Sequence, residues 1–583
     1  MDRLRDLAKR LGERKFVQWA LAYLAGAWAF AQAFDLVGEQ FGWPMHVRQG
    51  MTVLLGVGFV GALVIAWYHG EKGRQRVSGP ELLGLALLFG IAGLLVSRLD
   101  AGQETVLATT IPADTPPARD RPAVAVLPFA NISGDSLDAF FTDGIHEEII
   151  LRLSRVGSLD VIARTSVMPY RERSLGARQI ARELNVTALL GGSVRRAGRR
   201  VRITAELIAA EDEVAVWSDS WERELHPDSL FAVQEQIARS VAAALNAQLT
   251  RDEEAHLAVR PTHDLQAYDY YLLGRQRWAG RSTESLREAM SLFEAAIDRD
   301  PTYAPARAGI ADTWAVLAWY DTVPPATAYP RAREAAFAAI ELDPDLAEPH
   351  ATLGLVAHEF DGDWSAAETH FREAIRLRPN YAAAHHWYAI LLSNLGRHEE
   401  AVEEAERALA LDPLSTVVSG DVAGVFWTAG LPDRAIALLD RALDRDSVPP
   451  PVVELERAFI LLYESVWDRA ESSLVRWARL AGYPSPDRAG EIARAASGSA
   501  ASPDALATLG DIENSGVATR EDLIPLYALL GDRRSALEGV ERAERGRSPW
   551  LVWMGTLPWY DSLRAEPRFR DVLTRARLPN GRQ

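Results

Sequence analysis

Histidines are the residues of this chain with the clearest potential for metal chemistry. Five of them gather in the second half of the sequence: His350, His358, His370, His385 and His386. A metal-binding helix usually presents two histidines four residues apart, or a His-Glu-x-x-His motif, because both rings must reach one ion from one face. None of the five follows either pattern. We therefore expect them to be solvated or to pack against neighbouring helices rather than to bind a metal.

Two short motifs could take part in catalysis, His146-Glu147-Glu148 and Asp143-Gly144. The first lacks the second histidine of a zinc-protease motif, and we expect it on the exposed face of its helix. We expect Asp143 at a helix start, where a carboxylate accepts free backbone N–H groups. The chain has no cysteine, which excludes disulfides and cysteine nucleophiles. Because no nucleophile, base and metal set converges, we expect no enzymatic activity, no cofactor and no metal.

Five arginines crowd one predicted β-hairpin, which turns at Ala197-Gly198: Arg195, Arg196, Arg199, Arg200 and Arg202. They could contact an anionic polymer or lipid headgroups. The interpretation that we favour is a charged sheet edge, which discourages pairing with a foreign strand. In the preceding strand, Gly191-Gly192 predicts that another group approaches the backbone closely.

The elements that carry the histidines are predicted by small residues at a fixed spacing. Alanine is followed seven residues later by alanine at Ala289/Ala296, Ala332/Ala339, Ala367/Ala374, Ala401/Ala408, Ala435/Ala442 and Ala536/Ala543. The first four steps are 43, 35, 34 and 34 residues, and four pairs are followed by a proline: Pro301, Pro344, Pro379 and Pro413. A period near 34 is typical of tetratricopeptide repeats, in which each unit is a helix pair. Seven residues make two helical turns, so both alanines face one way and let helices approach closely.

We therefore predict an array of about eight repeat units over residues 260–583, with a terminal cap around Phe569. Stacked units form a superhelix whose first helices line a concave groove. His386 and Asn394 fall at positions that usually point into this groove, where their side chains could hold a peptide backbone. The alternative is that both are solvated surface residues.

Residues 122–250 alternate between strand and helix patterns in the order β-α-β-α-β-β-β-α, which predicts an α/β domain with a mixed sheet. The stretch contains Ala125-Val-Leu-Pro-Phe-Ala-Asn-Ile-Ser-Gly-Asp135, Phe141-Thr-Asp-Gly144, Val161-Ile-Ala-Arg-Thr-Ser166, Ala181-Arg-Glu-Leu-Asn185 and Gly192-Ser-Val-Arg-Arg196. In this order the motifs resemble the TolB amino-terminal-like domain, which is related to the FlgO-like fold. In bacterial proteins of this kind the domain precedes tetratricopeptide repeats, often behind an adenylate/guanylate cyclase or winged-helix domain. The resemblance implies an architecture and supplies no activity.

Residues 1–98 contain three apolar runs, at 16–37, 51–68 and 82–97. Their lengths are close to that of a membrane-spanning helix. Basic residues precede the first run and follow the second, so the positive-inside rule places the N-terminus in the cytoplasm. Three spans would place a tether, residues 99–121, and everything behind it in the periplasm of a Gram-negative cell. If the third run does not span, the body is cytoplasmic instead.

The predicted fold class is multidomain: three N-terminal transmembrane helices, a TolB-like α/β domain and an all-α tetratricopeptide superhelix. The formal net charge of −17 argues against nucleic acid as a partner. We interpret the chain as an inner-membrane scaffold that binds protein or peptide partners through its groove and the lipid bilayer through its N-terminal helices. The alternative is a sensory regulator, whose α/β domain binds a ligand and signals through a membrane partner. The sequence leaves the partner and the oligomeric state open.

Overall fold

The short apolar run from Ala123 to Val126 is fully buried and forms the strand β1 (Ala123–Val126) inside a mixed sheet. The computed structural model describes residues 121–133, 138–173, 175–280, 282–319, 323–446, 448–498 and 502–578. The strand order is β3-β1-β4-β5-β6, and the short β2 pairs with β4. The remaining bounds are β2 (Ala130–Asn131), β3 (Asp160–Val161), β4 (Ala188–Ala197), β5 (Arg200–Ala209) and β6 (Val214–Glu224). β1 runs parallel to β3 and β4, whereas β4, β5 and β6 are antiparallel.

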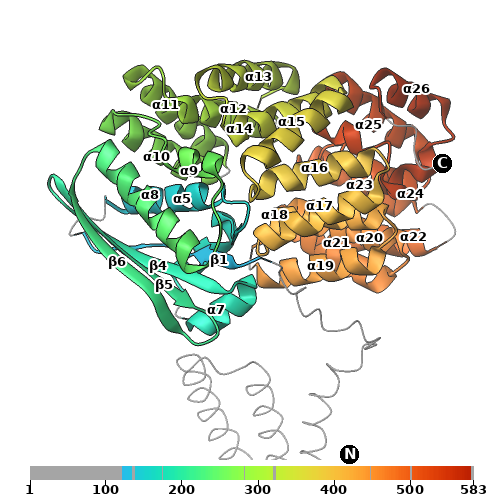
Figure 1. Ribbon diagram of the computed structural model, residues 1–583. Coiled ribbons are helices and arrows are strands. Elements are labelled where there is room, and N and C mark those ends of the chain that lie inside the picture. The colour runs from blue at the N-terminus through green and yellow to red at the C-terminus, as the bar shows by residue number, and fades with distance from the viewer. Residues whose placement is uncertain are drawn as a thin grey trace, which may run out of the picture. The chain divides into compact units, whose positions relative to one another are not determined.

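Two long helices connect the sheet to the rest of the chain. α5 (Ala139–Leu153) and α8 (Pro227–Ala244) pack on each other and on the strands, and α5 also packs on the first repeat helix (Figure 1). The smaller helices are α6 (Arg164–Val167), α7 (Ala177–Leu184) and α9 (Arg251–Leu257). At Gly192 a Cβ would lie 2.5 Å from both the Phe129 ring and the Thr204 carbonyl oxygen. The predicted close approach to this backbone is therefore confirmed.

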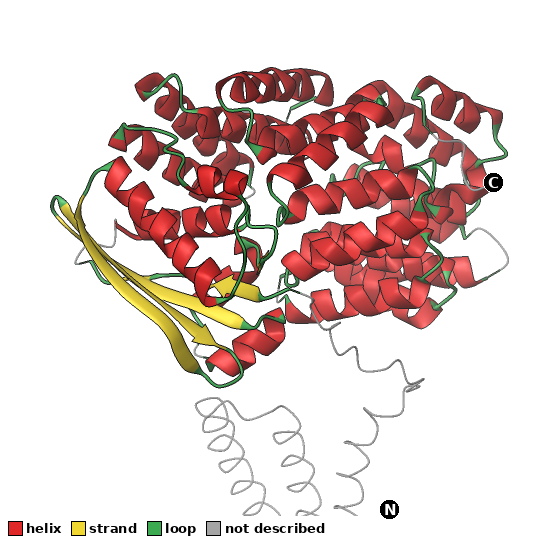
Figure 2. Ribbon diagram, in the orientation of Figure 1, coloured by secondary structure: helices red, strands yellow, loops and turns green. Residues whose placement is uncertain are grey.

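Beyond α9 the described chain is helical, and Figure 2 shows its strands confined to the sheet domain. The helices follow one another as antiparallel pairs. The pairs are α10 (Leu265–Ala279) with α11 (Thr283–Arg299), α12 (Ala304–Trp319) with α13 (Pro325–Leu342), α14 (Ala347–Val356) with α15 (Trp364–Leu377), α16 (Ala382–Asn394) with α17 (His398–Leu411), α18 (Thr416–Thr428) with α19 (Pro432–Arg445), and α20 (Pro451–Tyr463) with α21 (Trp467–Leu480). Shorter helices follow: α22 (Gly490–Ser497), α23 (Pro503–Asn514), α24 (Ile524–Leu529), α25 (Arg533–Gly546) and α26 (Pro567–Arg575).

The alanine pairs explain why the helices of a unit pack so closely. All twelve alanines have no exposed surface. Ten of them lie on the second helix of one of these pairs, and Ala536 and Ala543 lie on α25. The first helix of a pair can also carry a small residue where the two helices meet. At Gly354 of α14 a Cβ would lie 2.6 Å from the Phe371 ring of α15. Helices α11, α13, α15 and α17 each end just before the proline that follows their alanine pair. The prediction of tetratricopeptide helix pairs is confirmed.

The fold class requires one correction. Within the ranges described above, no helix is long and apolar enough to cross a bilayer. The fold class with three transmembrane helices is therefore wrong as stated, and what is observed is a mixed-sheet domain followed by a helical superhelix. The apolar runs 16–37, 51–68 and 82–97 and the tether 99–121 lie outside the described residues, except for Arg121.

The sheet domain and the repeats belong to one compact unit, residues 119–583. Sequence reasoning treated them as consecutive modules, because local periodicity gives no information on how modules pack. Their packing creates the sites described next.

Candidate functional site

Asn380, in the turn between α15 and α16, joins the sheet domain to the repeats. Its buried side-chain amide donates hydrogen bonds to three main-chain carbonyl oxygens after α5: Ser154 at 3.3 Å, Val156 at 3.0 Å and Leu159 at 2.7 Å. A buried carbonyl without a donor costs roughly 1–3 kcal/mol. The backbone also contributes, since Ser154 accepts the N–H of Asn380 at 3.2 Å and Val156 accepts that of Leu159 at 3.3 Å. The side chain of Asn380 thus adds a donor to each of three carbonyl groups in one turn.

Two further polar contacts lie on either side of Asn380. Arg407 Nη1 of α17 lies 2.9 Å from Oδ1 of the buried Asp160 in β3. Ser166 Oγ of α6 donates to Asp412 Oδ1 at 2.6 Å. Burial raises the pKa of Asp412 to about 6, and the Ser166 hydrogen bond opposes that rise. Since these contacts are buried and directional, they fix the sheet domain on the loops between repeat units.

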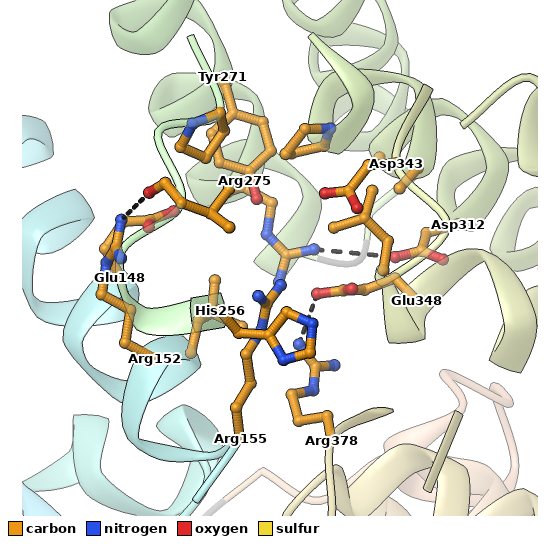
Figure 3. A pocket seen from close by; sticks show the side chains of 17 residues that line it. Glu148, Arg152, Arg155, His256, Tyr271, Arg275, Asp312, Asp343, Glu348 and Arg378 are labelled. Carbon is orange, nitrogen blue, oxygen red and sulfur yellow. Dashed lines mark hydrogen bonds and ion pairs between the residues drawn. The ribbon is translucent and has the colours of Figure 1, made fainter. Parts of the chain in front are cut away.

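A cavity of about 60 Å³ lies between α5, the segment after α9 and the first three helix pairs. Four arginines line it: Arg152, Arg155, Arg275 and Arg378. Four acids line it as well: Glu148, Asp312, Asp343 and Glu348. Figure 3 shows Arg155, Arg275 and Arg378 converging beside His256 near the middle of the cavity. The volume is enough for several water molecules or one small ligand.

Two of these arginines are neutralised by acids of the protein. Arg275 Nη2 lies 2.8 Å from Glu147 Oε1, and its Nη1 lies 3.8 Å from Asp312 Oδ2. Arg378 Nη1 lies 2.5 Å from Glu348 Oε1. These pairs place their charges on the walls of the cavity and leave little net field from either arginine.

The other cavity groups are less fully engaged. Arg152 Nη1 donates a hydrogen bond to the main-chain oxygen of Leu257 at 2.6 Å. That oxygen is uncharged, so it does not neutralise the guanidinium. Within the described ranges, no hydrogen bond or ion pair engages the guanidinium of Arg155, the carboxyl of Glu148 or the hydroxyl of Tyr271. Glu148 and Tyr271 are nevertheless 9 % and 5 % exposed. Three polar groups are therefore available to a molecule in the cavity.

The His146-Glu147-Glu148 motif is buried, contrary to the expected exposed helix face. His146 has no exposed surface, its Nε2 donates to the Val126 carbonyl oxygen at 2.8 Å, and burial lowers its pKa to about 4. Burial would raise the pKa of Glu147, but Arg275 and Arg164 outweigh it and hold that pKa below its ordinary value. Burial raises the pKa of Glu148 against the opposing charge of Arg152. The prediction failed because the motif lies between β1, which accepts the His146 hydrogen bond, and the repeat array, which supplies Arg275.

Asp143 does not start a helix. α5 begins at Ala139, and Asp143 lies one turn inside it, where its Oδ2 accepts from Arg171 Nη1 at 3.2 Å. Across the described ranges, no group of three or more histidines and carboxylates is placed to hold a metal ion.

His386 and Asn394 both lie on α16, which is the first helix of its pair, and both are buried. The solvated-surface alternative is therefore wrong for both. His386 Nε2 lies 2.8 Å from Asp421 Oδ2 on α18. The Asn394 amide nitrogen lies 3.1 Å from His358 Nε2, and its carbonyl oxygen accepts from the Thr556 hydroxyl at 2.8 Å. Asn394 thus already holds a residue from the carboxyl-terminal end of the chain.

That residue belongs to what we call the closing segment, residues 548–563. The segment contains two 3-10 turns, Pro549–Trp553 and Pro558–Leu563, and each residue from Leu551 to Tyr560 is buried. It crosses the carboxyl-terminal ends of successive first helices, at Trp319, Asn394, Trp427 and Tyr463. The groove that the sequence predicts is therefore occupied along this side by the protein itself.

Aromatic contacts hold the closing segment. The Trp550 ring lies edge-on to Trp319, with centroids 5.5 Å apart. The Trp559 ring lies 5.1 Å from the centroids of both Trp427 and Phe459. Tyr463 donates its hydroxyl hydrogen to the main-chain oxygen of Trp559. No local sequence signal links these positions, because they lie about a hundred residues or more apart.

The arginine hairpin is largely paired with acids of the next strand. Arg199 lies 2.8 Å from Glu224, Arg200 lies 3.1 Å from Glu222, and Arg202 lies 2.7 Å from Glu222. Arg196 lies 3.6 Å from Asp138. Arg195 is exposed on β4, opposite Arg202 on β5. Anion contact by this hairpin stays a prediction. The charged-edge interpretation is wrong for Arg200 and Arg202, because their strand β5 is paired on both sides and the edge strand is β6.

Comparison with known families identifies two segments. Residues 361–418 match the tetratricopeptide repeat model, and residues 120–240 match the second domain of HilA/YgeH-like transcriptional regulators. The second match differs from the TolB amino-terminal-like domain that the motifs resemble, so that resemblance is not confirmed.

One curated relative and several solved structures are similar to parts of the chain. A putative adenylate cyclase 3 of Rhizobium meliloti (strain 1021) is 38 % identical over 201 residues, 34 % of this chain and 34 % of the relative. The chain thus spans about a third of that relative's length. A thermophilic tetratricopeptide repeat protein of Thermus thermophilus is 22 % identical, with 34 % of this chain and 99 % of that chain covered and a TM-score of 0.29. The pilus biogenesis factor PilW is 17 % identical, with 42 % and 99 % covered and a TM-score of 0.29.

Proposed function

We propose that this chain is a protein-interaction scaffold whose superhelix binds an extended, aromatic-rich peptide segment across the ends of its first helices. The observation that carries the proposal is the closing segment. Two of its three tryptophans, Trp550 and Trp559, pack against the rings of Trp319 and Trp427 on first helices. Asn394 and Tyr463 hydrogen-bond to the Thr556 side chain and to the backbone of the segment. This combination of aromatic anchors and backbone contacts is how proteins usually recognise extended peptides.

In this proposal a partner protein presents a similar segment and replaces the chain's own. Removal of a buried tryptophan costs about 3–5 kcal/mol, so Trp559→Ala should release the closing segment without removing any repeat helix. A fluorescent peptide with the sequence of residues 548–563 should then bind the Trp559→Ala chain at least ten times more tightly than the wild type. A peptide with alanine in place of Trp550 and Trp559 is the matched control.

Hydrogen exchange makes this experiment decisive. If the amides of residues 549–563 exchange faster in Trp559→Ala than in the wild type, the groove has been opened. Failure of the peptide to bind that opened chain would refute peptide recognition by this surface.

A second candidate function, a sensory regulator, is favoured by the cavity between the sheet domain and the repeats. A ligand bound there contacts both α5 and the first repeat units, so its binding can change how the domains pack. The similarity of residues 120–240 to a domain of transcriptional regulators agrees with a regulatory role.

A further inference from the structure

The ion pairs around the cavity leave one guanidinium without a partner of its own. Arg275 is paired with Glu147 and Asp312, and Arg378 with Glu348. Arg152 is held by the main-chain oxygen of Leu257, and at the rim the half-buried Asp343 accepts the backbone N–H of Asp345 at 3.0 Å. Among the described residues, the Arg155 guanidinium has no ion-pair partner.

Arg155 is the group best placed to take a ligand. It lies two residues beyond the end of α5, and its side chain extends into the cavity toward Arg275 and Arg378 (Figure 3). Glu348 feels the charges of both Arg378 and Arg155 but forms its ion pair with Arg378, so an anion in the cavity gives Arg155 a partner of its own. The guanidinium offers a planar fork of N–H donors, which matches the oxygens of a carboxylate or phosphate. The Tyr271 hydroxyl adds a donor from α10.

Glu148 further restricts which anions can bind. The residue is 9 % exposed and lines the same cavity as Arg155. A carboxylate beside an anion site repels a fully deprotonated anion, but it accepts a hydrogen bond from one that still carries an O–H group. At neutral pH phosphate carries such a hydrogen and sulfate does not. A cavity of about 60 Å³ accommodates an ion of that size.

From this geometry we propose that the cavity binds a protonated phosphate group, with Arg155 and Tyr271 donating to its oxygens and Glu148 accepting its hydrogen. The proposal rests on the sensory function and names the ligand class of that site. The phosphate group can be the free ion or part of a small monoester, since both offer the same oxygens to Arg155.

Titration calorimetry on the full chain at pH 7 tests the proposal with inorganic phosphate and sulfate at matched ionic strength. Phosphate is expected to bind with one site per chain, and sulfate at least ten times more weakly. Arg155→Ala should weaken phosphate binding at least tenfold, and Arg155→Lys by less. Arg570→Ala, which removes an exposed arginine on α26, is the matched control and should bind as the wild type does.

The variant Glu148→Gln tests whether this carboxylate causes the preference for phosphate over sulfate. It should narrow the difference between phosphate and sulfate, because an amide can donate to sulfate where the carboxylate repels it. Equal binding of the two ions by the wild type, or equal phosphate affinity in Arg155→Ala and Arg570→Ala, would overturn the proposal. Glycerol phosphate distinguishes the sources: tighter binding than phosphate, lost in Arg155→Ala, indicates a monoester, and weaker binding indicates the free ion.

Hydrogen exchange separates the ligand site from the sensory function. If phosphate binds through Arg155 but changes exchange only in the residues that line the cavity, the ligand site stands and the sensory function is refuted. If exchange also slows in α16 or the closing segment, both are supported.

Discussion

At the scale of single residues, Asn380 has a large expected structural effect. Asn380→Ala removes a donor from three carbonyl oxygens, although Ser154 keeps the backbone N–H of residue 380 and Val156 keeps that of Leu159. The variant should lower the free energy of unfolding by about 1–3 kcal/mol. Urea denaturation followed by circular dichroism measures the change. Asn514→Ala, at the exposed end of α23, is the control and should stay within about 0.5 kcal/mol of the wild type. Similar losses in the two variants would mean that the Asn380 hydrogen bonds contribute little.

A second prediction at this scale concerns Glu359, which accepts hydrogen bonds from Tyr329 and Trp319. Burial raises its pKa to about 8, and these hydrogen bonds only partly oppose the rise. Because the folded pKa exceeds the unfolded value of 4.5, folding favours the protonated carboxyl. Its stabilisation is present below pH 4.5 and is lost as the pH rises through 8, by at most about 1.4 kcal/mol per pH unit.

The variant Glu359→Gln keeps an acceptor but cannot ionise. Its unfolding free energy should therefore fall less than that of the wild type between pH 5 and pH 8 in a series of urea titrations. Glu399→Gln, on the exposed side of α17, should retain the wild-type slope. Parallel curves for the wild type and Glu359→Gln would show that this carboxyl does not control the pH dependence.

At the scale of elements, the alanine pairs predict a sharp steric limit. Ala332 lies on α13 with no exposed surface, so Ala332→Leu forces extra methyl groups between packed helices and should cost about 1–3 kcal/mol. Ala326→Leu changes an exposed position on the same helix and should be nearly neutral. Thermal unfolding monitored by circular dichroism compares them. If Ala332→Leu is tolerated as well as Ala326→Leu, the tight packing of this pair is not needed for stability.

The same elements show where sequence reasoning succeeds and where it fails. Ala332 and Ala339 were identifiable because a helix pair is local and its period is visible in the chain. Asn394 was placed on the correct helix, but its partner Thr556 lies 162 positions later, and no periodic pattern connects them. Arg200 and Arg202 could have been matched to Glu222 only by knowing the β5–β6 register. The sequence is informative about contacts within a unit and uninformative about contacts between distant ones.

The cavity shows the same limit of sequence reasoning at the candidate functional site. Glu148 lies on α5 and Arg155 just beyond it, whereas Tyr271 and Arg378 come from two separate repeat units. In the sequence, the motif around Glu148 suggests a solvated helix face, because amphipathic patterns report burial without naming the partner surface. Only the docking of the sheet domain on the repeats turns these residues into a site.

At the scale of the whole molecule, that docking determines whether the sheet domain and the array behave as one body. The contacts of Asn380 and Arg407 bridge the two parts, and domains joined by buried contacts unfold together. In a denaturant series read by hydrogen exchange, β4–β5 and α20–α21 of the wild type should therefore lose protection at the same midpoint.

In the double variant Asn380→Ala with Arg407→Ala, the sheet strands should lose protection at a lower denaturant concentration than the helices. The double variant Asn514→Ala with Arg195→Ala controls for loss of the same residue types elsewhere. Coincident midpoints in the bridging variant would mean that apolar packing between α5 and α10 is sufficient for coupling, and a signal from the cavity would then have to travel through that packing.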